Sequence, residues 1–90
     1  MDNSYIYYRI AWLLRTNFSI PEQQLSFYSN LRTDLLLSTH EINLLLYLIE
    51  NHYNIQFKYG LEEEITKLNQ LVKLVSKELN IYVTTETNAL

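Results

Sequence analysis

Two neighbouring hydroxyl side chains, Ser38 and Thr39, stand in the stretch DLLLSTHEI, which spans residues 34–42. A hydroxyl in such a place can hold the start of a helix, or it can be a site of covalent chemistry. Ser38 and Glu41 form the Ser-x-x-Glu pattern of a capping box, in which each side chain accepts from the backbone N–H of the other residue. A cap of this kind contributes about 1 kcal/mol to stability. The pattern predicts that a helix begins at Ser38, and it leaves the purpose of the Thr39 hydroxyl open.

Three segments carry apolar residues at the spacing of an amphipathic helix, so the sequence predicts an all-α fold. The first follows the cluster of N-cap residues at 2–4 and stops near Asn17, the second begins at Ser38, and the third begins near Thr66. The predicted core stripes are, in chain order, Ile6, Ile10, Leu13 and Leu14; Ile42, Leu45, Leu46, Ile49 and Tyr53; and Leu68, Leu71, Val72, Val75 and Leu79.

The two connections between these helices differ in length. Residues 18–37 form a long loop, in which Pro21 followed by Glu22 favours a short helical turn. Residues 61–65 offer a second helical turn, and it follows Gly60, the only glycine, which predicts a backbone reversal. The apolar residues expected to pin the long loop to the helices are Phe18, Ile20, Leu25, Phe27, Leu31 and Leu35.

The composition fits one small domain. A chain of 90 residues leaves no room for a second domain, and a hydrophobic content of 48% is enough for one core. The absence of cysteine suits a reducing compartment, so we expect a cytoplasmic protein. We expect one helical domain over residues 1–80, followed by a tail at 81–90 whose β-branched residues indicate a short strand or a frayed, disordered end.

Charge and residue spacing argue against several classes of function. The net charge of −3 opposes nucleic-acid binding, because no basic stripe is present to neutralise phosphates, and no apolar run is long enough to span a membrane. His40 and His52 point about 120° apart on the second helix, so we expect no metal site. No nucleophile–base pair or phosphate-binding loop is visible, so we expect no catalytic residues and no enzymatic activity.

The order of elements and three stretches of sequence resemble the acyl carrier protein family. The stretches are FSIPEQQL at 18–25, NLRTDLLLSTHEINLLLYLIENHYNIQF at 30–57 and ITKLNQLVKLV at 65–75. The resemblance implies a small carrier-like bundle of three main helices with a short helical turn and a long loop after the first helix. In that family, the serine of an Asp-Leu-Gly-x-Asp-Ser-Leu motif carries 4′-phosphopantetheine, whose thiol holds acyl groups as thioesters.

The motif is only partly present in this chain. Asp34 and Leu35 match its first two residues, but Leu36 stands at the glycine and Thr39 at the attachment serine. Ser38 and His40 replace the Asp and Leu that flank that serine. Threonine is a hindered secondary alcohol, so we expect a structural role for Thr39 and no bound cofactor. Attachment of phosphopantetheine at Thr39 is the alternative, with Ser38 in reserve because a shift of one residue in the alignment would bring it into place.

The second helix also has an apolar face directed away from its predicted core stripe. Leu44, Tyr47 and Leu48 point outward, and His40, Glu41 and Asn51 surround them. A contiguous apolar patch on a small protein usually marks an interface, so this face is predicted to bind a protein partner or a second copy of the chain. The plain alternative is that the first helix or the tail covers it.

These observations lead to three hypotheses of function. The first is a non-catalytic carrier-like domain that lacks phosphopantetheine and acts through the outer face of its second helix, beside enzymes of fatty acid or polyketide synthesis. The second is a working acyl carrier modified at Thr39 or Ser38. The third is an unrelated helical adaptor or dimerisation module whose resemblance to carriers is convergent.

Overall fold

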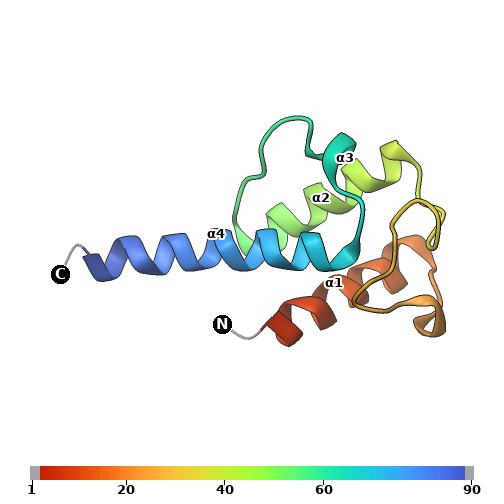
Figure 1. Ribbon diagram of the computed structural model, residues 1–90, viewed down its shortest axis with the longest axis horizontal. Helices are drawn as coiled ribbons and strands as arrows, with labels where there is room; N and C mark the ends of the chain where they lie inside the picture. The colour runs from red at the N-terminus through yellow and green to blue at the C-terminus, as the bar shows by residue number, and fades with distance from the viewer. Residues whose placement is uncertain (1–2, 89–90) are drawn as a thin grey trace.

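The computed structural model describes the backbone of residues 3–88 and the side chains of residues 4–79, and it has the predicted all-α fold (Figure 1). Over residues 3–88 there is no strand, and an isolated backbone bridge joins Asn30 to Lys67. In chain order, the elements are α1 (Asn3–Phe18), the 3-10 turn η1 (Glu22–Gln24), α2 (Thr39–Tyr53), α3 (Leu61–Glu64) and α4 (Leu68–Asn88).

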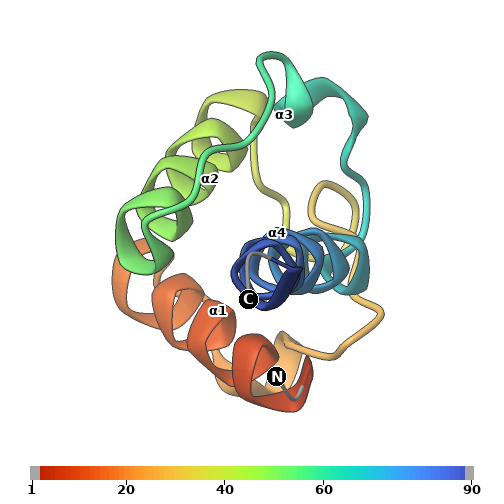
Figure 2. The same cartoon turned by 90° about the vertical axis from the view of Figure 1, so that its left-hand side faces the viewer.

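The helices form a small bundle in which α4 is the longest element. Figure 2 looks along α4 and shows α1 and α2 on one side of it, with α3 near the start of α2. α1 packs against both α4 and α2, and α2 also packs against α3. Because α1, α2 and α4 each present an apolar stripe to the same interior, one continuous core holds them together.

The predicted core stripes are confirmed. Every stripe residue is buried except Tyr53 and Leu79, which are half-buried at the ends of their stripes. The third main helix begins at Leu68, two residues later than the predicted Thr66. Thr66 and Lys67 precede the helix. The side-chain oxygen of Gln70 accepts from their backbone N–H groups, which the helix itself leaves without a partner.

The long loop is anchored as predicted. Ile20, Leu31 and Leu35 are buried, and the other three predicted anchors are half-buried against the core. Two backbone hydrogen bonds fasten the loop to the start of α4: Leu31 N–H donates to the Thr66 carbonyl at 2.8 Å, and Leu68 N–H donates to the Ser29 carbonyl at 2.9 Å. The loop therefore holds a fixed path from α1 to the start of α2.

Short turns complete the bundle where the sequence placed them. η1 follows Pro21, and α3 follows Gly60, whose φ of 85° is a left-handed conformation that glycine adopts without strain. Asn54 follows the last residue of α2 as its C-cap. It is another left-handed residue, and its N–H donates to the Glu50 carbonyl.

The short strand considered for the tail is not formed among residues 81–88, because α4 continues through Asn88. Each residue added to an existing helix gains one hydrogen bond, and this outweighs the weak preference of β-branched residues for strands. The last two residues of the predicted tail lie outside the described residues, and the division of the chain at residue 80 stays a prediction.

Candidate functional site

The capping box predicted from the sequence is present at the start of α2. Ser38 Oγ accepts from the Glu41 N–H at 3.1 Å, and Glu41 Oε1 accepts from the Ser38 N–H at 2.9 Å. Ser38 has an extended backbone and Thr39 is the first helical residue, so Ser38 is the N-cap. Its hydroxyl is therefore engaged in holding the first turn of α2.

The Thr39 hydroxyl also has a partner, which the sequence did not indicate. Arg32 Nη1 donates to Thr39 Oγ1 at 2.8 Å, and Arg32 Nη2 donates to the Glu62 carbonyl at 2.7 Å. Arg32 and Thr39 are both half-buried, where a hydrogen bond from a charged donor is stronger than in open solvent. One guanidinium thus ties the long loop to the start of α2 and to α3.

The role of Arg32 could not be predicted from the sequence, because its two contacts belong to no local pattern. Thr39 lies seven residues away along an irregular loop, and Glu62 lies 30 residues away in another helix. The loop itself is ordered by Asn30, whose side-chain oxygen accepts from the N–H groups of Arg32 and Thr33. Asp34, the residue that matches the carrier motif, accepts from the Asn30 N–H at 2.8 Å and so also stabilises this turn.

The outer face of α2 carries four exposed residues in one stripe. His40, Leu44, Tyr47 and Asn51 are spaced at i, i+4, i+7 and i+11, and all four side chains are exposed. Leu44 is 43% exposed and Tyr47 is 59% exposed, which is high for large apolar side chains. The structure therefore brings these four predicted partner-binding residues together on one surface, which we call the α2 face.

The other two predicted members of this surface have different surroundings. Leu48 was expected to point outward, but it is half-buried and packs against the core. Its direction on the helix differs by only about 60° from that of the buried Leu45, so it lies at the edge of the core stripe. Glu41 is half-buried, and its carboxylate is engaged in the capping box.

A shallow cavity of about 350 Å³ borders the α2 face, between α2 and the connection that leads to α3. Tyr47 and Glu50 line it from α2, and Phe57 and Tyr59 line it from the connection. Glu50 Oε2 accepts from the Phe57 N–H at 2.7 Å and fixes this connection beside the helix. Tyr59 is fully exposed and lies beside the α2 face. Helix periodicity could not predict this position, because Tyr59 lies outside any helix.

The C-terminal end of α2 holds two aromatic groups with shifted pKa values. Burial raises the pKa of the Tyr53 phenol, and the Tyr53 oxygen is buried without a hydrogen-bond partner among the described residues. Loss of hydration lowers the pKa of His52, and the positive charge of Arg9 lowers it further. The His52 ring stands edge-on to the Tyr53 ring, with 4.8 Å between ring centroids.

Among the side chains that the structure describes, at residues 4–79, no three or more histidine or acidic groups are gathered as a metal ion would require. Over residues 3–88, no helix combines the length and the apolar character needed to cross a bilayer.

No family model matches this sequence, and no curated protein is significantly similar to it.

Proposed function

We propose that this chain is a non-catalytic, carrier-like helical domain that binds another protein through the α2 face and carries no phosphopantetheine. The observation that carries the proposal is the hydrogen bond from the Arg32 guanidinium to the Thr39 hydroxyl, together with the capping bond of Ser38. Each hydroxyl that could receive the cofactor already has a structural task.

The chemistry of attachment explains why these contacts matter. A hydroxyl that attacks a phosphate must offer an oxygen lone pair and lose its proton. The hydrogen bond from the guanidinium occupies a lone pair of Thr39 Oγ1, and the threonine is a half-buried secondary alcohol. The Ser38 hydroxyl oxygen is already engaged as the acceptor that caps the first turn of α2. These contacts support the proposal that neither hydroxyl carries the cofactor.

The backbone before α2 supports the carrier-like part of the proposal. Leu36 has a φ of 58°, a left-handed conformation that glycine adopts far more readily than leucine. It stands where the carrier motif has its glycine, and its side chain is 79% exposed. A backbone that favours glycine at this position is what a domain descended from a carrier would retain after the residue itself had changed.

Intact-mass measurement tests the cofactor half of the proposal. The chain is incubated with coenzyme A and a broad-specificity phosphopantetheinyl transferase, with an acyl carrier protein as the positive control. We expect no mass increase for the wild-type chain, and one phosphopantetheine increment for the triple variant Arg32→Ala, Thr39→Ser, His40→Leu, which restores the serine and removes the guanidinium that engages its hydroxyl. An increment on the wild-type chain, mapped to Thr39 or to Ser38, would show a working carrier instead.

The binding half is tested by charge substitutions on the α2 face. Leu44→Glu and Tyr47→Glu place carboxylates at its centre, and Tyr8→Glu on α1 is a matched control at a tyrosine that is 69% exposed. In a pull-down, we expect a partner protein to bind the wild-type chain and Tyr8→Glu but neither of the α2 variants. Sedimentation of the same four proteins measures self-association. Equal retention and equal mass in solution for all four proteins would exclude this face.

A further inference from the structure

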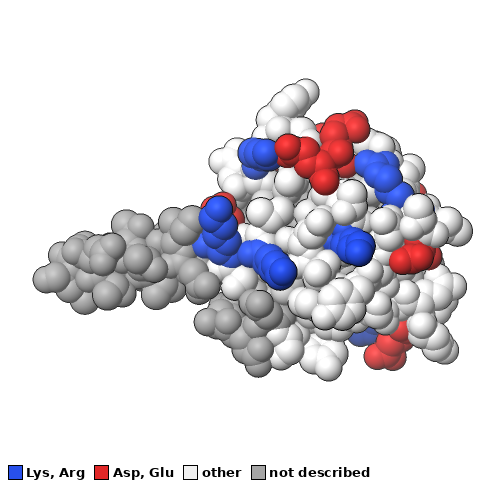
Figure 3. Space-filling model, viewed as in Figure 1, with Lys and Arg blue, Asp and Glu red and all other residues white. Residues whose placement is uncertain are grey.

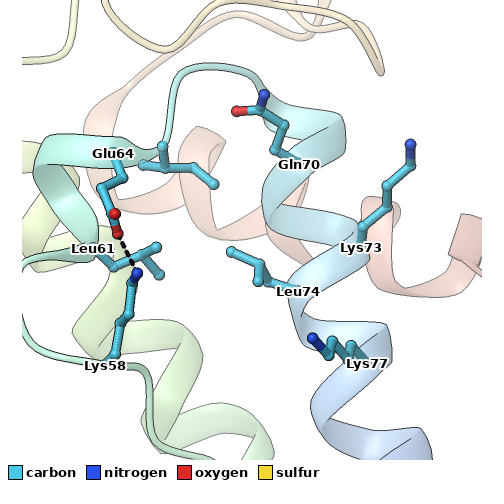
Figure 4. Close-up of a pocket in the computed structure, with 8 residues that line it drawn as sticks. Lys58, Leu61, Glu64, Gln70, Lys73, Leu74 and Lys77 are labelled. Carbon is cyan, nitrogen blue, oxygen red and sulfur yellow. Dashed lines mark ion pairs between the residues drawn. The ribbon is translucent and has the colours of Figure 1, made fainter.

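A second surface, separate from the α2 face, lies between α3 and α4. It is a shallow groove of about 440 Å³, and Figure 4 shows the side chains around it. The lining residues are Lys58, Leu61, Glu64, Ile65, Gln70, Lys73, Leu74 and Lys77.

The floor of the groove is apolar. Leu61 and Ile65 are buried members of the core, and Leu74 is half-buried against it. In Figure 4, Leu74 projects from α4 toward Leu61 of α3. An apolar side chain inserted from outside would remove the exposed part of Leu74 from water, which favours association.

The α4 side of the groove is positively charged, while the α3 side carries Glu64. Lys58 is paired with Glu64 at 2.6 Å, but Lys73 and Lys77 are exposed and have no ion-pair partner among the described residues. Figure 3 shows basic side chains along α4, while the acidic side chains gather over α3. Because the whole chain has a net charge of −3, this is a local concentration of positive charge on an acidic protein.

The α4 residues of the groove are arranged as a straight track. Gln70, Lys73, Leu74 and Lys77 fall within one stripe of the helix, and the distance from the first to the last is about 10 Å along the axis. Two turns of a docked helix span the same length. An apolar centre flanked by charges of one sign is the pattern that recognises an amphipathic helix of the opposite sign.

We propose that this groove binds an acidic amphipathic helix of a partner protein. Apolar residues at i and i+4 of that helix pack on Leu74 and the floor, and its carboxylates pair with Lys73 and Lys77. Two unpaired lysines neutralise too few phosphates to hold a nucleic acid or an anionic membrane firmly, whereas they match the carboxylates on two turns of a helix. The groove shares none of its lining residues with the α2 face, so either proposal can fail alone.

Fluorescence anisotropy with a defined probe tests the proposal. The probe is a fluorescein-labelled 14-residue peptide with leucines at helical i, i+4 spacing and glutamates elsewhere, and its matched control has lysines in place of the glutamates. The proteins are the full wild-type chain, Lys73→Glu/Lys77→Glu, and Lys67→Glu, which reverses an exposed lysine that does not line the groove. A fourth variant, Leu74→Ala, tests the apolar floor, and circular dichroism verifies that each variant is folded.

We expect saturable binding of the acidic peptide, weakened about tenfold by the Lys73/Lys77 reversal and little changed by Lys67→Glu. Leu74→Ala should weaken binding without changing its dependence on salt. Equal affinity for the two peptides, or equal affinity of the wild-type chain and the Lys73/Lys77 variant, would overturn the proposal. Tighter binding of phosphatidylglycerol vesicles or of a single-stranded oligonucleotide through these lysines would overturn it as well.

Discussion

The two ends of α2 use their polar side chains in opposite ways. At the N-terminal end, Ser38 and Thr39 each have a hydrogen-bond partner, and Arg32 joins this end to the rest of the bundle. At the C-terminal end, the Tyr53 hydroxyl is buried without a partner among the described residues. A buried hydroxyl stabilises a fold only when its lost hydration is replaced, so the two ends should respond with opposite sign when a hydroxyl is removed.

The largest effect is expected from Arg32→Ala. This change removes two hydrogen bonds from a charged donor, to Thr39 and to the Glu62 carbonyl, and should lower the free energy of unfolding by about 2–3 kcal/mol. Urea denaturation measures it, with Arg15→Ala as a control at an exposed arginine. If the free energy of unfolding falls equally in both variants, the two hydrogen bonds of Arg32 do not stabilise the N-terminal end of α2.

Removal of the N-terminal hydroxyl should have a smaller effect of the same sign. Ser38→Ala leaves the Glu41 N–H without its acceptor and should cost about 1 kcal/mol in the same assay. Ser38→Asp is the matched variant, because a carboxylate can also cap the helix, and it should retain most of the stability. A fully stable Ser38→Ala would mean that the capping box is dispensable.

Removal of the C-terminal hydroxyl should have the opposite sign. Tyr53→Phe deletes an oxygen that is buried without a partner, so the free energy of unfolding should stay constant or rise by up to about 1 kcal/mol. Tyr47→Phe, at an exposed tyrosine on the same helix, controls for the loss of a phenol in general. A loss of stability in Tyr53→Phe would reveal a hydrogen-bonded hydroxyl and remove the contrast.

The smallest effect concerns pH. The pKa of His52 is lower in the folded chain than its ordinary value of 6.5, so the unfolded chain binds more protons below that value. The stability contributed by neutral His52 is therefore complete above pH 6.5 and is lost as the pH falls toward the folded pKa. His52→Gln should lose less stability than the wild-type chain between about pH 7.5 and about pH 5.5, measured by urea denaturation. The same substitution at His40 is the control. If the free energy of unfolding of His52→Gln changed with pH as much as that of the wild-type chain, this prediction would be contradicted.

Much of the fold follows from short patterns in the chain. The apolar stripes predict α1, α2 and α4. The burial of Ile42 follows from its place in the stripe, because helical spacing fixes the direction of its side chain. Leu48 shows the limit of this reasoning, since a side chain at the edge of the stripe is covered or exposed according to what packs nearby. The tail shows another limit, because helix continuation overrides the local preference of its β-branched residues.

The candidate site divides in the same way. Local patterns in the chain predict the capping box of Ser38 and Glu41 and the backbone reversal at Gly60, because each depends on residues within one turn of the chain. The contact of Arg32 with Thr39 and the groove between α3 and α4 arise only from the packing of the folded chain. These join segments far apart in the sequence, and whether distant polar groups meet depends on how the helices pack, which no local spacing records.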